Sequence, residues 1–349
     1  MQEQYDVPLA PLTTFRLGGP AARLVEAAAA GDIVDAVRAA DAAADPVLLV
    51  GGGSNLVVAD AGWPGLVVLL RSRGVHLRRD GDRVTVTVQA GESWDDLVAR
   101  AVAEGLAGIE CLAGIPGLAG ATPVQNVGAY GQEVAETIVA VTAWDRERGQ
   151  VRELSTMDCG FAYRTSIFKN VKRYVVLSAT FSLEPSELSG PVRYAELARA
   201  LGVTIGERAK LAEVREAVLA LRRGKGMVLD AADHDTWSAG SFFTNPVLST
   251  VDIAAFEARL APGTAYPHWP AAGGATKLSA AWLIEHAGFG RGYRRGRVAL
   301  SGKHTLALSN RGGASTGELL GLAREVRDGV HARYGVALHP EPQLVGVAL

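Results

Sequence analysis

The sequence predicts an α+β fold that is divided into two or three domains. Its 349 residues are too many for one ordinary hydrophobic core. Hydrophobic residues make up 48% and charged residues 21% of the chain, which is the composition of a globular protein. Short apolar runs typical of strands and longer periodic runs typical of helices both occur, which gives the mixed fold class.

Charge and cysteine content exclude several classes of function. The formal net charge of −2 gives no general attraction to nucleic acid or to anionic membranes. Residues 1–6 lack the features of a signal peptide, and no apolar run approaches the length of a membrane span. Cys111 and Cys159 are the only cysteines, and the histidines show no metal-binding spacing. We therefore expect a cytoplasmic protein without a metal, a nucleic-acid partner or a membrane partner.

The first expected unit is a strand–helix–strand arrangement. Strands are expected at residues 24–27, 47–50 and 66–70, and a helix is expected from Asp32 to Ala43. Asp32 is a favoured N-cap residue for that helix.

A glycine-rich turn, Gly51 to Asn55, follows the strand at 47–50, and residues 56–58 are expected to resume that strand. Three consecutive glycines permit positive φ angles and close approach of a ligand, and successive N–H groups can form an anion nest. The segment is read equally well as a phosphate cradle or as a plain turn between strands. Leu56 stands where a Rossmann fingerprint needs glycine, and no P-loop lysine follows, so neither of those motifs is present.

The second expected unit contains strands at 83–90, 139–144 and 174–183, and a helix that Ser93 caps. Residues 114–131 hold five glycines and two prolines, which predicts an irregular, close-packed loop. Long irregular loops are usually functional, and the amides of this loop suit a heteroaromatic ring. A purely structural crossover remains the alternative.

The rest of the chain is expected to be richer in helices. Residues 185–191 form a connection, and a short segment follows at residues 194–197. Helices are expected at residues 211–223, 251–260, 277–287 and 316–334. Gly335 is expected to close the last helix. Strands are expected at 304–309 and in the tail.

Three polar residues in tight loops are candidates for chemistry. Arg164 is suited to holding a carboxylate, although a structural arginine is the commoner case. Ser241, between Gly240 and two phenylalanines, is suited to donating a proton in a dry pocket, or is a turn residue. Glu341 lies between two prolines, so it is either a rigidly held catalytic carboxylate or a solvated one.

Six motifs lie in a fixed order along the chain, and each is weak alone. They are Gly51-Gly-Gly-Ser-Asn55, Gly114-Ile-Pro-Gly117, Gln125-Asn-Val-Gly-Ala-Tyr-Gly131, Tyr163-Arg-Thr-Ser-Ile-Phe168, Gly240-Ser-Phe-Phe-Thr-Asn-Pro246 and Pro340-Glu341. Together they resemble the UDP-N-acetylenolpyruvoylglucosamine reductases, the MurB family, from about Thr13 to Val345. The resemblance implies a two-lobed FAD-binding domain of the vanillyl-alcohol-oxidase (PCMH) type and a C-terminal α/β substrate domain.

The resemblance also implies boundaries and a reaction. Residues 1–70 would form the first FAD lobe with the tail 335–349 packed on it, residues 71–224 the second lobe, and residues 225–334 the substrate domain. The reaction would be the NADPH-dependent, FAD-mediated reduction of the enolpyruvyl ether of UDP-N-acetylglucosamine to UDP-N-acetylmuramate, for peptidoglycan synthesis. FAD would be non-covalent, and the protein a monomer or a weak oligomer with a UDP-sugar as its partner.

In this reading the three candidate residues acquire roles. Arg164 would stabilise the negative charge that develops on the substrate, Glu341 would hold and polarise its carboxylate, and Ser241 would protonate the α-carbon. The glycine turn would be a pyrophosphate nest that holds flavin N5 towards these three residues. The implied FAD contacts are Gly51, Gly52, Gly53, Ser54, Asn55, Gly114, Ile115, Pro116, Gly117, Gln125, Asn126, Gly128, Ala129 and Tyr130. The implied substrate contacts are Tyr163, Tyr194, Lys225, Asn245, Lys277 and His286, of which Tyr194 would be the mobile tyrosine of the longer subtype.

Some residues depart from the pattern of the family. Thr244 stands where many relatives have lysine, Pro342-Gln343 follows Glu341 where Val-Arg is common, and His286 occupies a variable position. Two alternatives therefore stay open beside the reductase: a related flavin oxidase for another small substrate, and a flavin- or nucleotide-sugar-binding module without catalysis.

Overall fold

The computed structural model describes residues 1–349 and divides into two units, each assembled from separate stretches of chain. The first unit comprises Met1–Val7, Ala21–Gly52 and Pro64–Val228, and the second comprises Pro8–Pro20, Gly53–Trp63 and Leu229–Leu349. The glycine turn carries the chain from one unit to the other. The division into two FAD lobes and a substrate domain stays a prediction.

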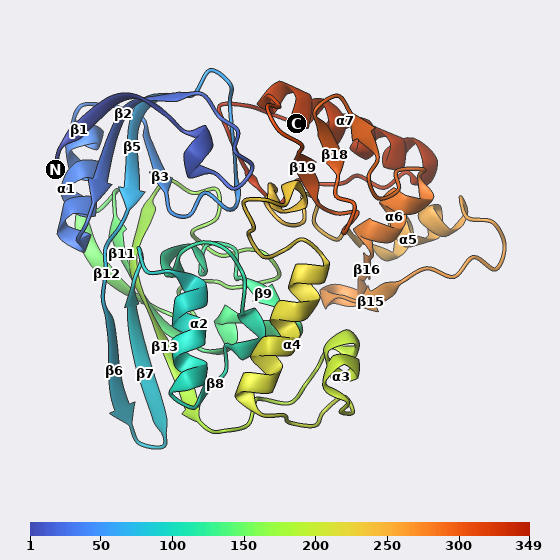
Figure 1. Ribbon diagram of the computed structural model, residues 1–349, viewed down its shortest axis with the longest axis horizontal. Coiled ribbons are helices and arrows are strands. Elements are labelled where there is room, and N and C mark those ends of the chain that lie inside the picture. The colour runs from blue at the N-terminus through green and yellow to red at the C-terminus, as the bar shows by residue number, and fades with distance from the viewer. The chain divides into compact units, whose positions relative to one another are not determined.

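One sheet of the first unit is built by the beginning of the chain, with the strand order β1-β2-β5-β3 (Figure 1). Its strands are β1 (Glu3–Pro8), β2 (Pro20–Ala27), β3 (Val47–Val50) and β5 (Trp63–Leu70). Helix α1 (Ala30–Ala42) buries Ile33 and Val37 in the core beside this sheet. The expected strand–helix–strand unit is therefore confirmed. Asp32 is not its N-cap, because Ala29 holds that position and the Asp32 carboxylate accepts the Ala29 N–H from inside the first turn.

The second sheet of this unit is antiparallel, with the strand order β12-β11-β13-β7-β6 and with β8 paired to β13. Its strands are β6 (Val75–Asp80), β7 (Arg83–Gln89), β8 (Leu106–Ala107), β11 (Ile138–Asp145), β12 (Gln150–Ser155) and β13 (Tyr174–Pro185). In β7 the alternation predicted from sequence places Val86 and Val88 in the core. Strands β6 and β12 were not predicted.

Three helices and an irregular loop complete the first unit. Helix α2 (Trp94–Ala103) begins at Ser93, whose side chain accepts from the Asp96 N–H at 3.4 Å, as expected. Helix α4 (Leu211–Gly224) packs against α2 and against α3 (Ala195–Leu201) (Figure 1). The loop at 114–131 is irregular, as predicted, and ends in the short pair β9 (Gly128–Ala129) and β10 (Gln132–Glu133).

The second unit contains three small sheets and three helices (Figure 1). The sheets are β14-β16-β15, β17-β18-β19 and β20-β4, formed by β4 (Leu56–Val58), β14 (Val247–Leu248), β15 (His268–Pro270), β16 (Thr276–Leu278), β17 (Arg294–Arg295), β18 (Val298–Leu300), β19 (Leu308–Asn310) and β20 (Gln343–Val345). The helices are α5 (Thr250–Glu257), α6 (Ala280–His286) and α7 (Thr316–Tyr334). Phe15, Leu17 and Val57, from the beginning of the chain, join the core of this unit.

Three sequence-based expectations are corrected here. Residues 56–58 do not resume the strand at 47–50, because β4 pairs in parallel with β20 in another sheet. The helix expected from Lys277 begins at Ala280, since Ser279 caps it and Lys277 lies in β16. The strand expected at 304–309 is β19, Leu308–Asn310.

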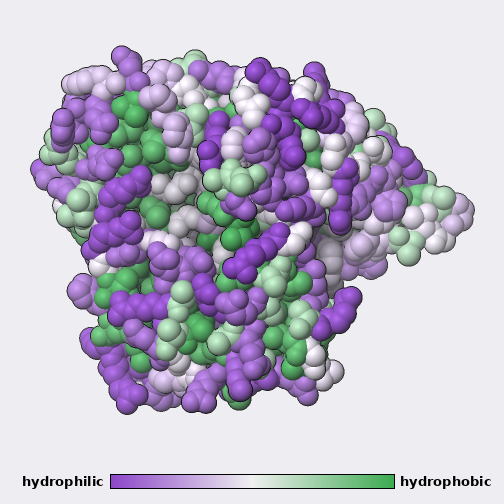
Figure 2. All heavy atoms as spheres, in the orientation of Figure 1, coloured by the Kyte–Doolittle hydropathy of each residue, from purple (hydrophilic) through white to green (hydrophobic).

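The surface mixes polar and apolar residues. On the face drawn in Figure 2, hydrophilic side chains are interspersed with smaller groups of hydrophobic ones. No helix is long and apolar enough to cross a membrane.

Helix α7 depends on its N-terminal cap, which gives a stability prediction. The Ser315 hydroxyl accepts the Glu318 N–H at 3.1 Å, and Glu318 accepts the Ser315 N–H at 2.8 Å. We expect Ser315→Ala to lower the free energy of unfolding by about 1 kcal/mol, because one N–H of the first turn loses its partner. Ala29→Ser, which adds the hydroxyl that α1 lacks, should leave stability equal or higher. Urea unfolding of both variants measures this, and an S315A midpoint equal to the parent's would contradict it.

Candidate functional site

Two glycine segments meet in the first unit. A Cβ atom built on Gly52 would lie 2.8 Å from the Gly117 Cα, and one built on Gly51 would lie 3.3 Å from Leu118 Cδ1. The backbones therefore approach as closely as glycine allows. Gly117 also has a φ of +120°, which other residues rarely adopt. The two segments that the sequence singled out for FAD thus lie side by side.

The second half of the glycine turn is fixed within the second unit. Gly53 has a φ of +61°, and a Cβ atom there would lie 1.9 Å from the Leu12 carbonyl oxygen. The Gly53 carbonyl accepts the Thr14 N–H at 3.2 Å, and the Asn55 carbonyl accepts the Gln343 N–H at 2.9 Å. Only glycine fits at position 53, and β20 holds the end of the turn.

Arg164 is positioned by the irregular loop of the first unit. Its Nη2 donates to the Gly128 carbonyl at 2.6 Å, and its Nη1 donates to the Asn126 carbonyl at 3.3 Å. Glu133 Oε1 lies 4.0 Å from Nη1, and the guanidinium lies 5.4 Å from the centre of the Tyr163 ring. Arg164 has a φ of +53°, an uncommon conformation that places its side chain against this loop. The structure therefore brings Arg164 and Tyr163 to the loop that carries the expected flavin contacts.

Asn126 organises that loop. It is only 2% exposed, and its Nδ2 donates to Glu133 Oε2 at 2.8 Å and to the Ala162 carbonyl at 3.2 Å. Its Oδ1 accepts the Ala135 N–H at 3.1 Å. The side chain of Asn126 thus joins the loop to the turn that carries Arg164. Its expected contact with FAD stays a prediction.

Backbone pairing brings Ser241 and Glu341 together in the second unit. The Glu341 N–H donates to the Phe242 carbonyl at 2.8 Å, and Phe243 and Pro340 form an antiparallel bridge. Ser241 is half-buried and precedes the fully buried Phe242. The Ser241 hydroxyl makes no hydrogen bond to another side chain or to the backbone, so its proton is not committed. Two of the three candidate catalytic residues, far apart in sequence, are therefore neighbours.

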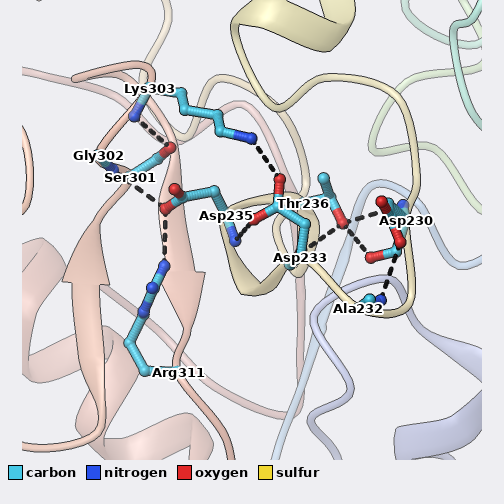
Figure 3. Close-up of polar contacts among 9 residues, drawn as sticks. All are labelled: Asp230, Ala232, Asp233, Asp235, Thr236, Ser301, Gly302, Lys303 and Arg311. Carbon is cyan, nitrogen blue, oxygen red and sulfur yellow. Dashed lines mark hydrogen bonds and ion pairs between the residues drawn. The ribbon is translucent and has the colours of Figure 1, made fainter.

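A polar network fastens the stretch that leads into the candidate serine (Figure 3). Asp235 accepts from the Gly302 N–H at 3.0 Å and from Arg311 Nη1 at 2.6 Å. Asp233 pairs with Lys303 at 2.6 Å, and this hydrogen bond lowers the pKa of Asp233. These contacts tie the stretch to the turn between β18 and β19 and to the residue that follows β19.

Three expected ligand contacts meet at α3 and α4. The rings of Tyr130 and Tyr194 pack edge to face with centroids 5.4 Å apart, and Lys225 Nζ lies 5.5 Å from the centre of the Tyr130 ring. Lys225 also pairs with Glu196. Burial alone would lower the pKa of Lys225. The hydrogen bond to Glu196 and the negative charge of Glu196 outweigh this effect, so the pKa of Lys225 is raised. A charged lysine is therefore held beside two tyrosines, an arrangement suited to an anionic group.

The three expected substrate contacts of the second unit are not gathered at one point. Asn245 Oδ1 accepts the Ala280 N–H at 3.0 Å, at the start of α6, and Lys277 lies over the Trp269 ring. His286 lies at the opposite end of α6, stacked on Trp282 at 4.1 Å between centroids. The packing of His286 on its own helix accounts for its position without a ligand.

The remaining expected FAD contacts lie in the same loops. Ser54, Ile115, Pro116, Gln125 and Ala129 are all half-buried. Sequence reasoning missed the polar residues that hold these loops: Glu133, Asp95, Arg215 and Arg222. Asp95 accepts the Gly114 N–H at 2.7 Å, a role that its position in the first turn of α2 does not reveal. The aspartate network before Ser241 was missed as well, although its dense run of aspartates was a visible signal.

Comparison with known proteins gives two family matches. Residues 21–155 match the model of an FAD binding domain, and residues 232–345 match the C-terminal domain of UDP-N-acetylenolpyruvoylglucosamine reductase. The chain is 58% identical to the UDP-N-acetylenolpyruvoylglucosamine reductase of Streptomyces coelicolor, over 100% of this chain and 92% of the relative. It is 57% identical to that of Salinispora arenicola, over 98% and 95%. The crystal structure of MurB from Thermus caldophilus is similar in fold, with a TM-score of 0.67, 24% identity, and coverage of 99% and 98%.

The contact between Gly52 and Gly117 generates a prediction. Gly52→Ala places a methyl group 2.8 Å from the Gly117 Cα, so the two segments must separate. We expect FAD to bind at least about tenfold more weakly, which corresponds to about 1.4 kcal/mol. Gly31→Ala is the matched control, because no atom lies within 4 Å of its Cβ and alanine favours the helix there. Fluorescence titration of the apoproteins with FAD tests this, and equal affinities of G52A and G31A would refute a cradle at this contact.

Proposed function

Because the chain belongs to the UDP-N-acetylenolpyruvoylglucosamine reductase family, we propose that it reduces the enolpyruvyl ether of UDP-N-acetylglucosamine to UDP-N-acetylmuramate, with NADPH as hydride donor. Family membership confirms the expected fold class and the dependence on FAD. The observation that carries the proposal is the backbone pairing that makes Ser241 and Glu341 neighbours. The family match favours the reductase over the binding module and over the oxidase for another substrate.

The residues present fit FAD. Glycine is required where Gly52 meets Gly117 and where Gly53 meets the Leu12 carbonyl, and such turns leave backbone N–H groups accessible to phosphate. When bound, FAD supplies hydride transfer between NADPH and the substrate. The glycine segments would hold this cofactor by their backbone. No cysteine lies in either segment, and Cys111 and Cys159 are buried, in keeping with non-covalent binding.

Ser241 acts in the proposal as the proton donor to the α-carbon of the enolpyruvyl group. An isolated serine hydroxyl is a weak acid, but the carbon that receives the proton becomes strongly basic as hydride arrives at its neighbour. The flanking residues Phe242 and Phe243 are 0% and 1% exposed, so the backbone on one side of the hydroxyl is rigid. A hydroxyl without a protein partner keeps its proton for the substrate.

Arg164 and Glu341 act on the substrate carboxylate. The Arg164 guanidinium stabilises the negative charge that spreads into the carboxylate, and it is already oriented by the Asn126 and Gly128 carbonyls. Glu341, in its protonated form, donates a hydrogen bond to this carboxylate. Its backbone is fixed on both sides, by the bond to Phe242 and by β20. The Arg164 side chain therefore does not have to be ordered when the substrate binds.

The remaining roles concern the nucleotide diphosphate and the sugar. Tyr194, Lys225, Asn245 and Lys277 are proposed contacts, and the packing of Tyr194 on Tyr130, beside Lys225, supports the first two. The departures from the family pattern have local explanations. The Thr244 N–H donates to the His339 carbonyl at 3.0 Å within the pairing that carries Glu341, and Pro342 is buried where the chain turns into β20.

We also infer a cytoplasmic monomer or weak oligomer. Cys111 and Cys159 are free thiols, which is typical of a reducing compartment. Burial raises the pKa of Cys159 to about 11, so this thiol stays protonated and unreactive. NADPH and UDP-sugars are metabolites of the same compartment.

Replacing Ser241 separates binding from protonation. In Ser241→Ala we expect NADPH to reduce the flavin at the parental rate, while formation of UDP-N-acetylmuramate slows by about 10²- to 10⁴-fold, because general acid catalysis is lost. Stopped-flow absorbance at the flavin bands and product chromatography measure the two steps. Ser241→Cys, which retains a proton donor, should recover part of the rate. A preparation that binds no FAD, or an S241A enzyme with unchanged turnover, would overturn the proposal.

A further inference from the structure

Arg222, in the last turn of α4, has a buried donor without a partner. Its Nε is inaccessible to solvent and makes no hydrogen bond. Its one hydrogen bond runs from Nη2 to the Met227 carbonyl at 2.9 Å, and no carboxylate pairs with it. An unpaired buried donor on a charged group is costly, so such a group needs an explanation.

Arg215 lies two turns earlier on the same face of α4, and its Nε is also buried without a hydrogen bond. The two arginines differ in their carboxylate partners. The Nη2 of Arg215 lies 3.4 Å from Asp95 Oδ2, and its Nη1 lies 3.3 Å from Glu216. Asp95 is at the same time the acceptor for the Gly114 N–H. Two carboxylates thus pair directly with Arg215, whereas Arg222 forms no ion pair and only the more distant charge of Asp95 acts on it.

The surroundings of Arg222 are residues expected to bind FAD. Its Nε lies 3.4 Å from the position that a Cβ atom would take on Gly114. Gly114 begins the turn whose other end, Gly117, meets Gly52. Burial lowers the pKa of Arg222 to about 10 against the opposing effects of Tyr130 and Asp95, so Arg222 remains a cation at neutral pH.

We propose that Arg222 is a ligand of bound FAD, to which its Nε–H donates a hydrogen bond and its charge supplies a counter-ion. This rests on the proposed function, because it assumes that FAD occupies the Gly114–Gly117 turn. The acceptor is an oxygen of the diphosphate or of the reduced flavin ring, and both carry the negative charge that suits a guanidinium with a buried, unpaired Nε. The cofactor would supply the partner that the protein does not.

The test compares Arg222→Met with Arg223→Met. Arg223 is the exposed neighbour on the same helix, so both variants lose one positive charge and only one loses the buried donor. Titration of each apoprotein with FAD should show at least tenfold weaker binding for R222M and a change below twofold for R223M. If wild type and R223M bind no FAD either, the proposed function itself fails. If R222M alone binds FAD like wild type, this inference fails.

A structural role for Arg222 would give a different result. Removing a charged group that has an unpaired buried donor and no ion pair should leave the melting temperature of the FAD-free protein unchanged or higher, while the rise in melting temperature on adding FAD becomes smaller. An FAD-free R222M that melts well below wild type, with an undiminished FAD-induced rise, would instead mark a structural arginine. Arg222→Lys should recover part of the affinity.

The midpoint potential of the bound flavin identifies the acceptor: a fall in R222M indicates the flavin ring, and an unchanged value indicates the diphosphate. Normal FAD binding with weakened UDP-sugar binding would overturn the inference.

Discussion

The hydrogen bond from the Glu341 N–H to the Phe242 carbonyl, 2.8 Å long, is the contact on which the second unit depends. It belongs to a short antiparallel pairing in which the Thr244 N–H also donates to the His339 carbonyl. The pairing joins the end of the chain to the stretch that carries Ser241. Because main-chain groups make it, its geometry holds whatever side chains stand at neighbouring positions. The unusual Thr244 and Pro342 are therefore compatible with an intact site.

In the first unit, side chains rather than paired backbone segments position the candidate catalytic residue, Arg164. There the irregular loop forms only the short strand pair β9–β10, and buried side chains satisfy other backbone groups of the loop. Asn126 joins three segments, and the carbonyls left over at Asn126 and Gly128 accept from Arg164. Buried polar groups are stable only when they are fully paired. A loop that satisfies itself in this way holds the arginine without help from a ligand.

The sequence predicts those parts of the fold that repeat a local pattern. Strand β7 alternates, and α7 carries a serine cap and a closing Gly335 with a φ of +71°. Strand β6 was missed because it lies at the edge of its sheet and most of its side chains are exposed. The parallel pairing of β4 with β20 has no local signal, because the two strands are contributed by distant parts of the chain.

For the site, the order of six short motifs pointed to Arg164, Ser241 and Glu341, whereas their mutual positions came only from the folded chain. Arg222 is the clearest example of a residue whose environment cannot be predicted from the sequence. In sequence it is one of two adjacent arginines on a helix, and nothing distinguishes it from the exposed Arg223. Its burial is decided by how the Gly114 turn packs on α4, which is a property of tertiary structure alone.

The discontinuous make-up of the two units bears on how the protein is made. The second unit takes Pro8–Pro20 and Gly53–Trp63 from the beginning of the chain, yet β4 finds its partner only in Gln343–Val345. During synthesis, the apolar side chains of Phe15, Leu17 and Val57 therefore cannot be fully buried in their core until almost the whole chain has left the ribosome. Most of the first unit, completed by Val228, is free to fold earlier. The region that carries the candidate proton donor would then be the last to assemble, and chaperone binding during translation would be concentrated on these early apolar segments.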